Sequence, residues 1–105
     1  MRLAPILHLT EHQVHGERRW TGRAVLPGVI ARDLLILSFQ GALIGVRNRC
    51  PHRDIEILLG RVDAEGVLEC PSHGAQLPLT GVDLCGRPVI EQDGTFYLVL
   101  DDEPS

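Results

Sequence analysis

Lysine is absent from this sequence: all ten basic residues among its 105 are arginines. Every positive side chain is therefore a planar, permanently charged guanidinium rather than an ammonium. Ten basic residues against fourteen acidic residues leave a formal net charge of −4. Because the phosphate backbone of nucleic acids attracts basic surfaces, this balance argues against nucleic acid as a partner.

Long apolar runs are also missing. No stretch approaches the ~20 apolar residues of a membrane-spanning helix, and residues 1–12 lack the apolar core of a secretory signal. We therefore expect a soluble, cytoplasmic protein that does not contact a membrane. A length of 105 residues suits one compact domain, which we expect to span residues 1–105.

Cysteine is scarce, and its number is odd. Three cysteines cannot pair into a complete set of disulfides. In a chain without a secretory signal, cysteines close to histidines suggest a metal site before they suggest disulfides. The third cysteine, Cys85, has no such neighbour and is interpreted as a small apolar residue rather than a ligand.

The distribution of apolar residues predicts an all-β protein. Short apolar or β-branched runs alternate with turn signals, and no helical spacing persists. Gln40-Gly41 and Asp93-Gly94 each suit a hairpin turn between two such runs. The polar segment Thr10–Gly16 is interpreted as a turn or a single helical turn. Many short strands joined in this way indicate a small antiparallel sandwich or barrel, with strands expected at residues 6–9, 20–26, 34–39, 42–47, 67–70, 89–92 and 95–100.

Two short clusters hold the residues with the most distinctive chemistry: Cys50-Pro51-His52 and, after seventeen intervening residues, Cys70-Pro71-Ser72-His73-Gly74. Each cluster follows a predicted strand, so both are expected on loops at one end of a sheet. A proline directly after each cysteine fixes φ and stiffens its loop. Gly74 permits a positive φ or a close backbone approach beside a bulky group. Two thiols and two imidazoles are enough ligands to close a metal site.

Three interpretations of these clusters compete. The cysteines can be buried apolar residues and the histidines ordinary surface residues. A tetrahedral zinc ion can take a Cys₂His₂ set, although common zinc fingers pair cysteine with cysteine and histidine with histidine along the chain. A two-iron centre, in which one iron takes both thiolates and the other both imidazoles, suits loops that each offer one of each kind.

The pattern resembles the Rieske family of [2Fe-2S] proteins, and the resemblance extends beyond these ligands. Residues 41–48 (GALIGVRN) are similar to the family's approach to the first cysteine, Gly60 lies where the family closes its first loop, and residues 76–81 (QLPLTG) are similar to the stretch after the second loop. The resemblance implies an all-β Rieske-like sandwich or barrel. Its two loops, at about 48–60 and 70–81, would form a cluster-binding subdomain.

By this resemblance the chain binds one [2Fe-2S] cluster, with Cys50 and Cys70 on the inner iron and His52 and His73 on the outer iron. It implies a one-electron carrier, not an enzyme, between an NAD(P)H-dependent flavin reductase and a terminal oxygenase: a soluble ferredoxin of a ring-hydroxylating dioxygenase system. Two alternatives stay open: the small subunit of an assimilatory NAD(P)H nitrite reductase, and a structural zinc module for protein interaction.

Residues that are absent from the motif point to a subtype. Ile55 and Ser72 stand where high-potential members carry the two cysteines of a disulfide between the loops, and Ala75 replaces a serine that hydrogen-bonds a cluster sulfur. Fewer hydrogen bonds to sulfur predict a potential at the low end of the family range. The segment from Gly81 to Val89 is shorter than in typical members, so we expect it to cover the cluster less.

A few further residues are interpreted singly. Arg49 and Arg53, beside the first ligands, are either solvated or contacts for a partner's carboxylates. Trp20 is expected in the core. Three histidines near the N-terminus have helix-like spacing but are better explained as polar turn residues than as a second metal site: His8, His12 and His15.

Overall fold

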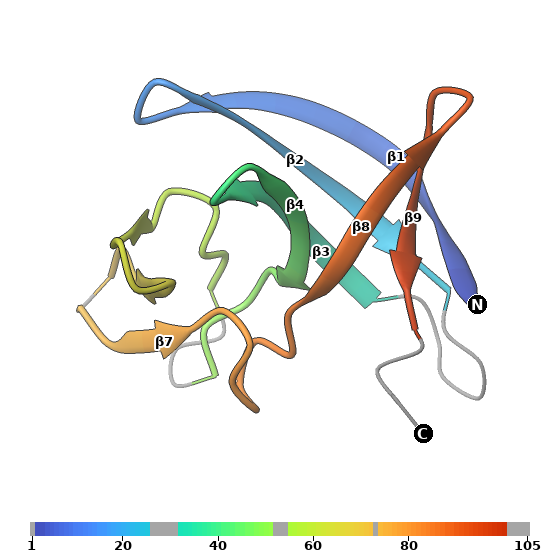
Figure 1. Cartoon of the computed structure of the whole chain (residues 1–105). Helices are drawn as coiled ribbons and strands as arrows, with labels where there is room; N and C mark the ends of the chain where they lie inside the picture. Colours follow the sequence, from blue (N-terminus) through green and yellow to red (C-terminus); the bar gives the residue numbers. More distant parts are fainter. Residues whose placement is uncertain (1, 26–31, 52–54, 73, 101–105) are drawn as a thin grey trace.

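The computed structural model describes residues 2–25, 32–51, 55–72 and 74–100. Within these ranges the chain forms nine strands and no helix, which confirms the predicted all-β class (Figure 1). The strands are β1 (Leu3–Val14), β2 (Glu17–Ala24), β3 (Arg32–Phe39), β4 (Ala42–Arg47), β5 (Arg61–Val62), β6 (Val67–Glu69), β7 (Gln76–Pro78), β8 (Arg87–Gln92) and β9 (Thr95–Val99).

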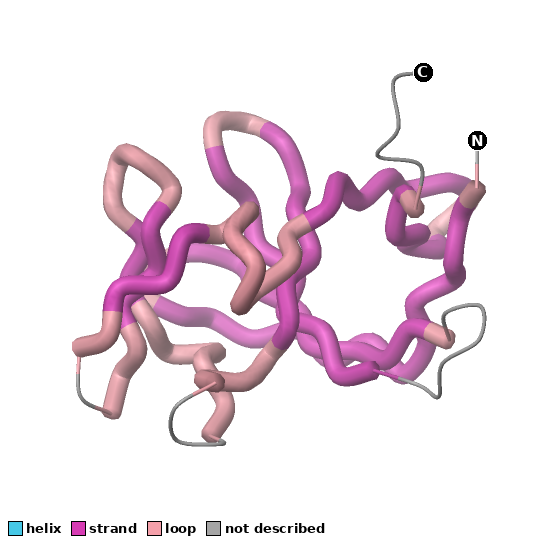
Figure 2. The backbone as a smooth tube through the Cα atoms, turned by 90° about the horizontal axis from the view of Figure 1, so that it is seen from below, coloured by secondary structure: helices cyan, strands magenta, loops and turns pink. Residues whose placement is uncertain are grey.

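Six strands close into an antiparallel barrel in the order β1-β2-β3-β4-β8-β9, with β9 pairing back onto β1. The remaining strands, β5, β6 and β7, form a small separate sheet. In sequence this sheet lies between β4 and β8, which are neighbours in the barrel. The small sheet and its loops therefore form a lobe at one side of the barrel, on the left in Figures 1 and 2.

Strand β3 separates the two hydrophobic cores. Its side chains alternate between the two faces of the sheet, so Leu34 and Ile36 pack inside the barrel while Leu35 and Leu37 pack against the lobe. All four are buried. This double burial explains why the strand reads as a continuous apolar run instead of an alternating one.

The two predicted hairpins are confirmed. Gln40 and Gly41 join β3 to β4 with φ of 53° and 83°, and Asp93 and Gly94 join β8 to β9 with φ of 53° and 81°. Positive φ at both central residues is the geometry of a type I′ turn, which matches the right-handed twist of the paired strands.

The turn predicted over Thr10–Gly16 is wrong. Strand β1 continues to Val14 and pairs with β2 as far as Val14 opposite Glu17, so only His15 and Gly16 form the turn. A β-bulge between Leu7 and Thr10 shifts the register. The outer part of the hairpin is mostly polar and exposed, although Val14 and Arg19 are buried there.

Other boundaries differ by smaller amounts. Strand β2 begins at Glu17, earlier than predicted, and the predicted end of that strand at Leu26 lies outside the described residues. The two short strands β5 and β7 were not predicted. Trp20 is half-buried against the barrel core and meets Phe96 edge-on, with ring centroids 5.3 Å apart.

Candidate functional site

Each of the two predicted loops begins with a buried cysteine. Cys50 is the third residue after β4, and Cys70 follows β6 directly. Their exposed fractions are 0% and 2%, and both side chains belong to the buried cluster between β3 and the lobe. All three cysteines of the chain are thiols, and Cys85 is exposed. The fold thus brings together the two cysteines that the sequence singled out.

The same backbone contact closes both loops. The amide of Cys50 donates to the carbonyl of Ile55 at 2.8 Å, and the amide of Cys70 donates to the carbonyl of Ala75, also at 2.8 Å. In each loop the acceptor lies five positions after the donor. The second loop is tightened further by a bond of 3.0 Å from Gly74 N to Cys70 O, with Gly74 at φ of +77° as expected for this glycine.

Both predicted histidine ligands lie outside the described residues, as does Arg53. In sequence, His52 stands two residues after Cys50 and His73 stands three residues after Cys70, so each falls between the donor and the acceptor of its loop closure. Their roles as ligands stay predictions.

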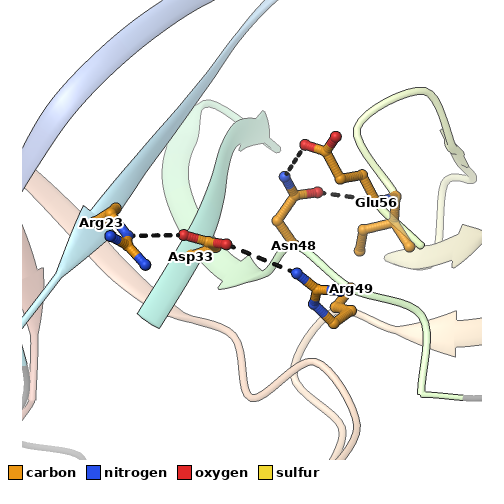
Figure 3. Close-up of polar contacts among 6 residues, drawn as sticks. Arg23, Asp33, Asn48, Arg49 and Glu56 are labelled. Atoms are coloured by element: carbon orange, nitrogen blue, oxygen red, sulfur yellow. Dashed lines mark hydrogen bonds and ion pairs between the residues drawn. The ribbon is translucent and has the colours of Figure 1, made fainter. Parts of the chain in front are cut away.

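Asn48 joins the two ends of the first loop (Figure 3). Its buried side chain accepts a hydrogen bond from Ile57 N and donates one to a carboxylate oxygen of Glu56, each at 3.1 Å. The backbone amide of Asn48 donates to the carbonyl of Asp33 on β3 at 3.2 Å. The loop is therefore anchored to the barrel at the residue that ends the motif GALIGVRN.

Exposed ion pairs surround this anchor. Asp33 lies 3.0 Å from Arg23 Nε and 3.8 Å from Arg49 Nη2 (Figure 3). All three side chains are largely exposed, and such pairs contribute about 0–1 kcal/mol. Arg49 thus has an intramolecular carboxylate partner, which neither interpretation of this arginine anticipated.

We expect Asn48→Leu to lower the free energy of unfolding by about 1–3 kcal/mol, because it leaves the buried amide of Ile57 without its acceptor. Urea denaturation followed by circular dichroism measures the change. Asp33→Asn is the matched control and should cost about 0.5 kcal/mol or less, since its ion pairs are exposed. Equal losses in the two variants would contradict the anchoring role.

The β1–β2 hairpin supplies contacts to the lobe that the sequence did not reveal. Arg19 Nη1 donates to the carbonyls of Leu58 and Gly60 at 2.6 and 2.7 Å, and His15 Nε2 donates to the carbonyl of Leu59 at 2.8 Å. Burial lowers the pKa of the Arg19 guanidinium below its ordinary value. Because about forty residues of sequence separate donors and acceptors, no local pattern could have indicated these contacts.

The N-terminal histidines are not turn residues, except for His15. His8 and His12 lie on β1, and His12 Nε2 shares a hydrogen bond of 2.9 Å with the Thr21 hydroxyl. Across residues 2–25, 32–51, 55–72 and 74–100 no group of three or more His, Cys, Asp or Glu side chains is placed to hold a metal ion. The interpretation of these histidines without a second metal site stays a prediction.

The shortened segment after the second loop packs beneath it. Gly86 N donates to Leu79 O and Cys85 N to Gly81 O, each at 2.8 Å. Leu84 is fully buried in the same cluster as Cys50 and Cys70. The two cysteines are therefore buried despite the short segment. The prediction that this segment covers the cluster less stays untested, because His52 and His73 lie outside the described residues.

The family comparison identifies the cofactor of the chain. A model of the Rieske [2Fe-2S] domain matches residues 9–92. The chain belongs to the Rieske family. Its cofactor is a [2Fe-2S] cluster, and two buried thiols on matched loops fit a group that cysteine thiolates bind.

One curated relative is named 3-phenylpropionate/cinnamic acid dioxygenase ferredoxin subunit, from Photorhabdus laumondii subsp. laumondii. It is 30% identical over 80 residues, which cover 68% of this chain and 76% of the relative. No solved structure gives a significant match. The chain is thus a Rieske electron-transfer component. Among its described residues, no helix is long and apolar enough to span a membrane.

Proposed function

We propose that Cys50, His52, Cys70 and His73 hold the cluster, with the thiolates on the inner iron and the imidazoles on the outer iron. The observation that carries this proposal is the pair of equivalent loop closures, Cys50 to Ile55 and Cys70 to Ala75, each of which begins at a buried cysteine. The loops at about 48–60 and 70–81 then form the cluster-binding part of one Rieske domain, residues 1–105.

The chain's own residues set the electron affinity of this site. When bound, a [2Fe-2S] cluster takes up and releases one electron. Two neutral imidazoles in place of two anionic thiolates leave less negative charge at the site, which places the potential within roughly −150 to +300 mV. Ile55 and Ser72 form no disulfide between the loops, and Ala75 offers no hydroxyl to sulfur, so the low end of that range is favoured.

The chain serves, in this proposal, as a one-electron carrier between an NAD(P)H-dependent flavin reductase and a terminal oxygenase of a ring-hydroxylating system. The name of the curated relative supports this role. A groove of about 560 Å³ lies beside the second loop. Its wall contains apolar, basic and acidic side chains that a partner can contact, among them Leu59, Arg61 and Glu69. Partner docking at such a carrier is weak and fast.

The test begins with the purified chain, loaded with iron and sulfide under anaerobic conditions. A red-brown protein with a rhombic EPR signal after reduction is the expected result, and a colourless, zinc-containing protein would overturn the proposal. In the second step, a dioxygenase-type flavin reductase should reduce the protein, and a terminal oxygenase with its aromatic substrate should reoxidise it. Association with a nitrite reductase, without electron uptake from the flavin reductase, would instead support the nitrite reductase subunit.

Replacing His73 by cysteine should lower the reduction potential toward about −400 mV, the value typical of plant-type ferredoxins with four cysteine ligands. The physical reason is the added negative charge, which disfavours a further electron. Spectroelectrochemical titration measures the change. His12→Gln, on β1 and outside the loops, is the control and should leave the potential unchanged. A higher potential in His73→Cys would contradict the charge argument.

A further inference from the structure

Strand β2 carries two adjacent arginines with opposite environments. Arg18 is exposed, at 62% of its side-chain surface, and forms an ion pair with Glu11. Arg19 is only 2% exposed. A buried guanidinium is costly unless hydrogen bonds compensate for the water it loses, so the partners of Arg19 indicate why the fold retains it.

Those partners are backbone carbonyls at the end of the first loop. One nitrogen, Nη1, donates to both Leu58 O and Gly60 O, while Nε has no hydrogen-bond partner among the described residues. His15, at the tip of the same hairpin, donates to Leu59 O between them. Three successive carbonyls are thus bound by side chains of the β1–β2 hairpin.

The segment of residues 58–60 ends the first loop and lies against the strand that leads into the second. On one side it directly follows Ile57, whose amide Asn48 binds at the base of the first loop. On the other side Gly60 is pressed against β6: a Cβ atom there would lie 2.6 Å from the carbonyl of Glu69, the residue that precedes Cys70. A displacement of this segment would therefore be transmitted to both loops.

We propose that Arg19 is a positioning residue for the cluster, fixing residues 58–60 so that the loops of Cys50 and Cys70 keep one relative placement. This inference rests on the proposed ligand set. The buried positive charge has a second effect, because it favours the reduced cluster, which carries one more negative charge than the oxidised one.

The test compares Arg19→Met, which keeps the length of the side chain but not its donors, with Arg18→Met on the exposed face. In the loaded protein, Arg19→Met should release iron to a chelator about ten- to a hundredfold faster, the factor expected for losing a buried hydrogen bond from a charged group. Its potential should fall, and its EPR g-values should shift. Arg18→Met should stay within about twofold of the unmodified chain in release rate. A folded Arg19→Met protein that matches Arg18→Met in all three measurements would overturn the proposal.

Arg19→Lys keeps the positive charge but changes the hydrogen-bond donors, so it distinguishes the two effects. It is also the variant to use if Arg19→Met does not fold. An ammonium restores the potential but reproduces the two-carbonyl contact incompletely, so iron release should remain faster than in the unmodified chain. Unchanged release in Arg19→Lys would overturn the positioning role.

Amide hydrogen exchange at residues 59–61 of the cluster-free protein tests the inference independently of the ligand set. Faster exchange in Arg19→Met than in Arg18→Met supports it, and equal exchange overturns it. If the unmodified chain binds no cluster, the proposed function fails, while this comparison still decides whether Arg19 holds the segment.

Discussion

Replacing Cys70 by serine is expected to yield a chain that binds no [2Fe-2S] cluster. Iron binds the soft thiolate strongly, whereas a serine hydroxyl stays protonated and is a poor substitute at a site of this kind. Cys70 lies buried at the start of the second loop, whereas Cys50 is already a proposed ligand and Cys85 is exposed. The iron content should fall from two atoms per chain to nearly none, with loss of visible absorption and of the EPR signal.

Cys85→Ser is the matched control within the same chain. Cys85 is exposed, and its Sγ donates to the carbonyl of Val82 at 3.0 Å, on the segment that follows the second loop. This variant should retain two irons per chain and an unchanged EPR signal. Loss of the cluster in Cys85→Ser together with its retention in Cys70→Ser would contradict the proposed ligand set.

Replacing Gly86 by alanine is expected to destabilise the protein by about 3 kcal/mol, the upper part of the range for overpacking. A Cβ atom at this position would lie 2.3 Å from the carbonyl oxygen of Leu79 and 2.9 Å from the side chain of Ile44. The oxygen is a backbone atom and accepts the Gly86 amide at 2.8 Å, so it cannot move away without breaking that bond. The melting temperature should fall by roughly 12–24 °C.

Gly81→Ala provides the comparison from the same connection between β7 and β8. Its added Cβ would come no closer than 3.3 Å, to the side chain of Pro78, so the loss should be about 1 kcal/mol or less. Thermal unfolding of both variants in the cluster-free state separates packing from cofactor binding. A Gly86→Ala protein as stable as Gly81→Ala would show that the Leu79 carbonyl can be displaced cheaply.

The sequence predicted best those features that nearby residues determine. The two predicted hairpin turns depend on the adjacent residues Gln40-Gly41 and Asp93-Gly94, whose own positive φ angles form the turns. The cysteines were identified for a similar reason, because each lies with its proline and histidine within one short stretch. The Rieske resemblance then supplied the cofactor, and the family match confirmed that cofactor, while the ligand set stays a prediction.

Features that depend on distant partners could not be predicted in this way. The polar outer half of β1 is a strand because β2 satisfies its backbone, not because of its own propensity. Strands β5 and β7 have two and three residues and form only as parts of the small sheet. Nothing in the sequence distinguishes Arg19 from its neighbour Arg18. Only the folded chain brings the carbonyls of residues 58–60 to Arg19.

The pairing of β4 with β8 brings the two ends of the lobe to one place on the barrel. Gly45 lies opposite Arg87, so the chain leaves the barrel for the lobe and re-enters it at adjacent points. Residues 48–86 could be transplanted into another protein in place of a simple hairpin turn only where the recipient sheet also presents apolar side chains equivalent to Leu35 and Leu37, which pack against the lobe. Such a graft would need to import the arginine and histidine of the neighbouring hairpin as well, because a recipient scaffold lacking them leaves three backbone carbonyls of the guest without their donors.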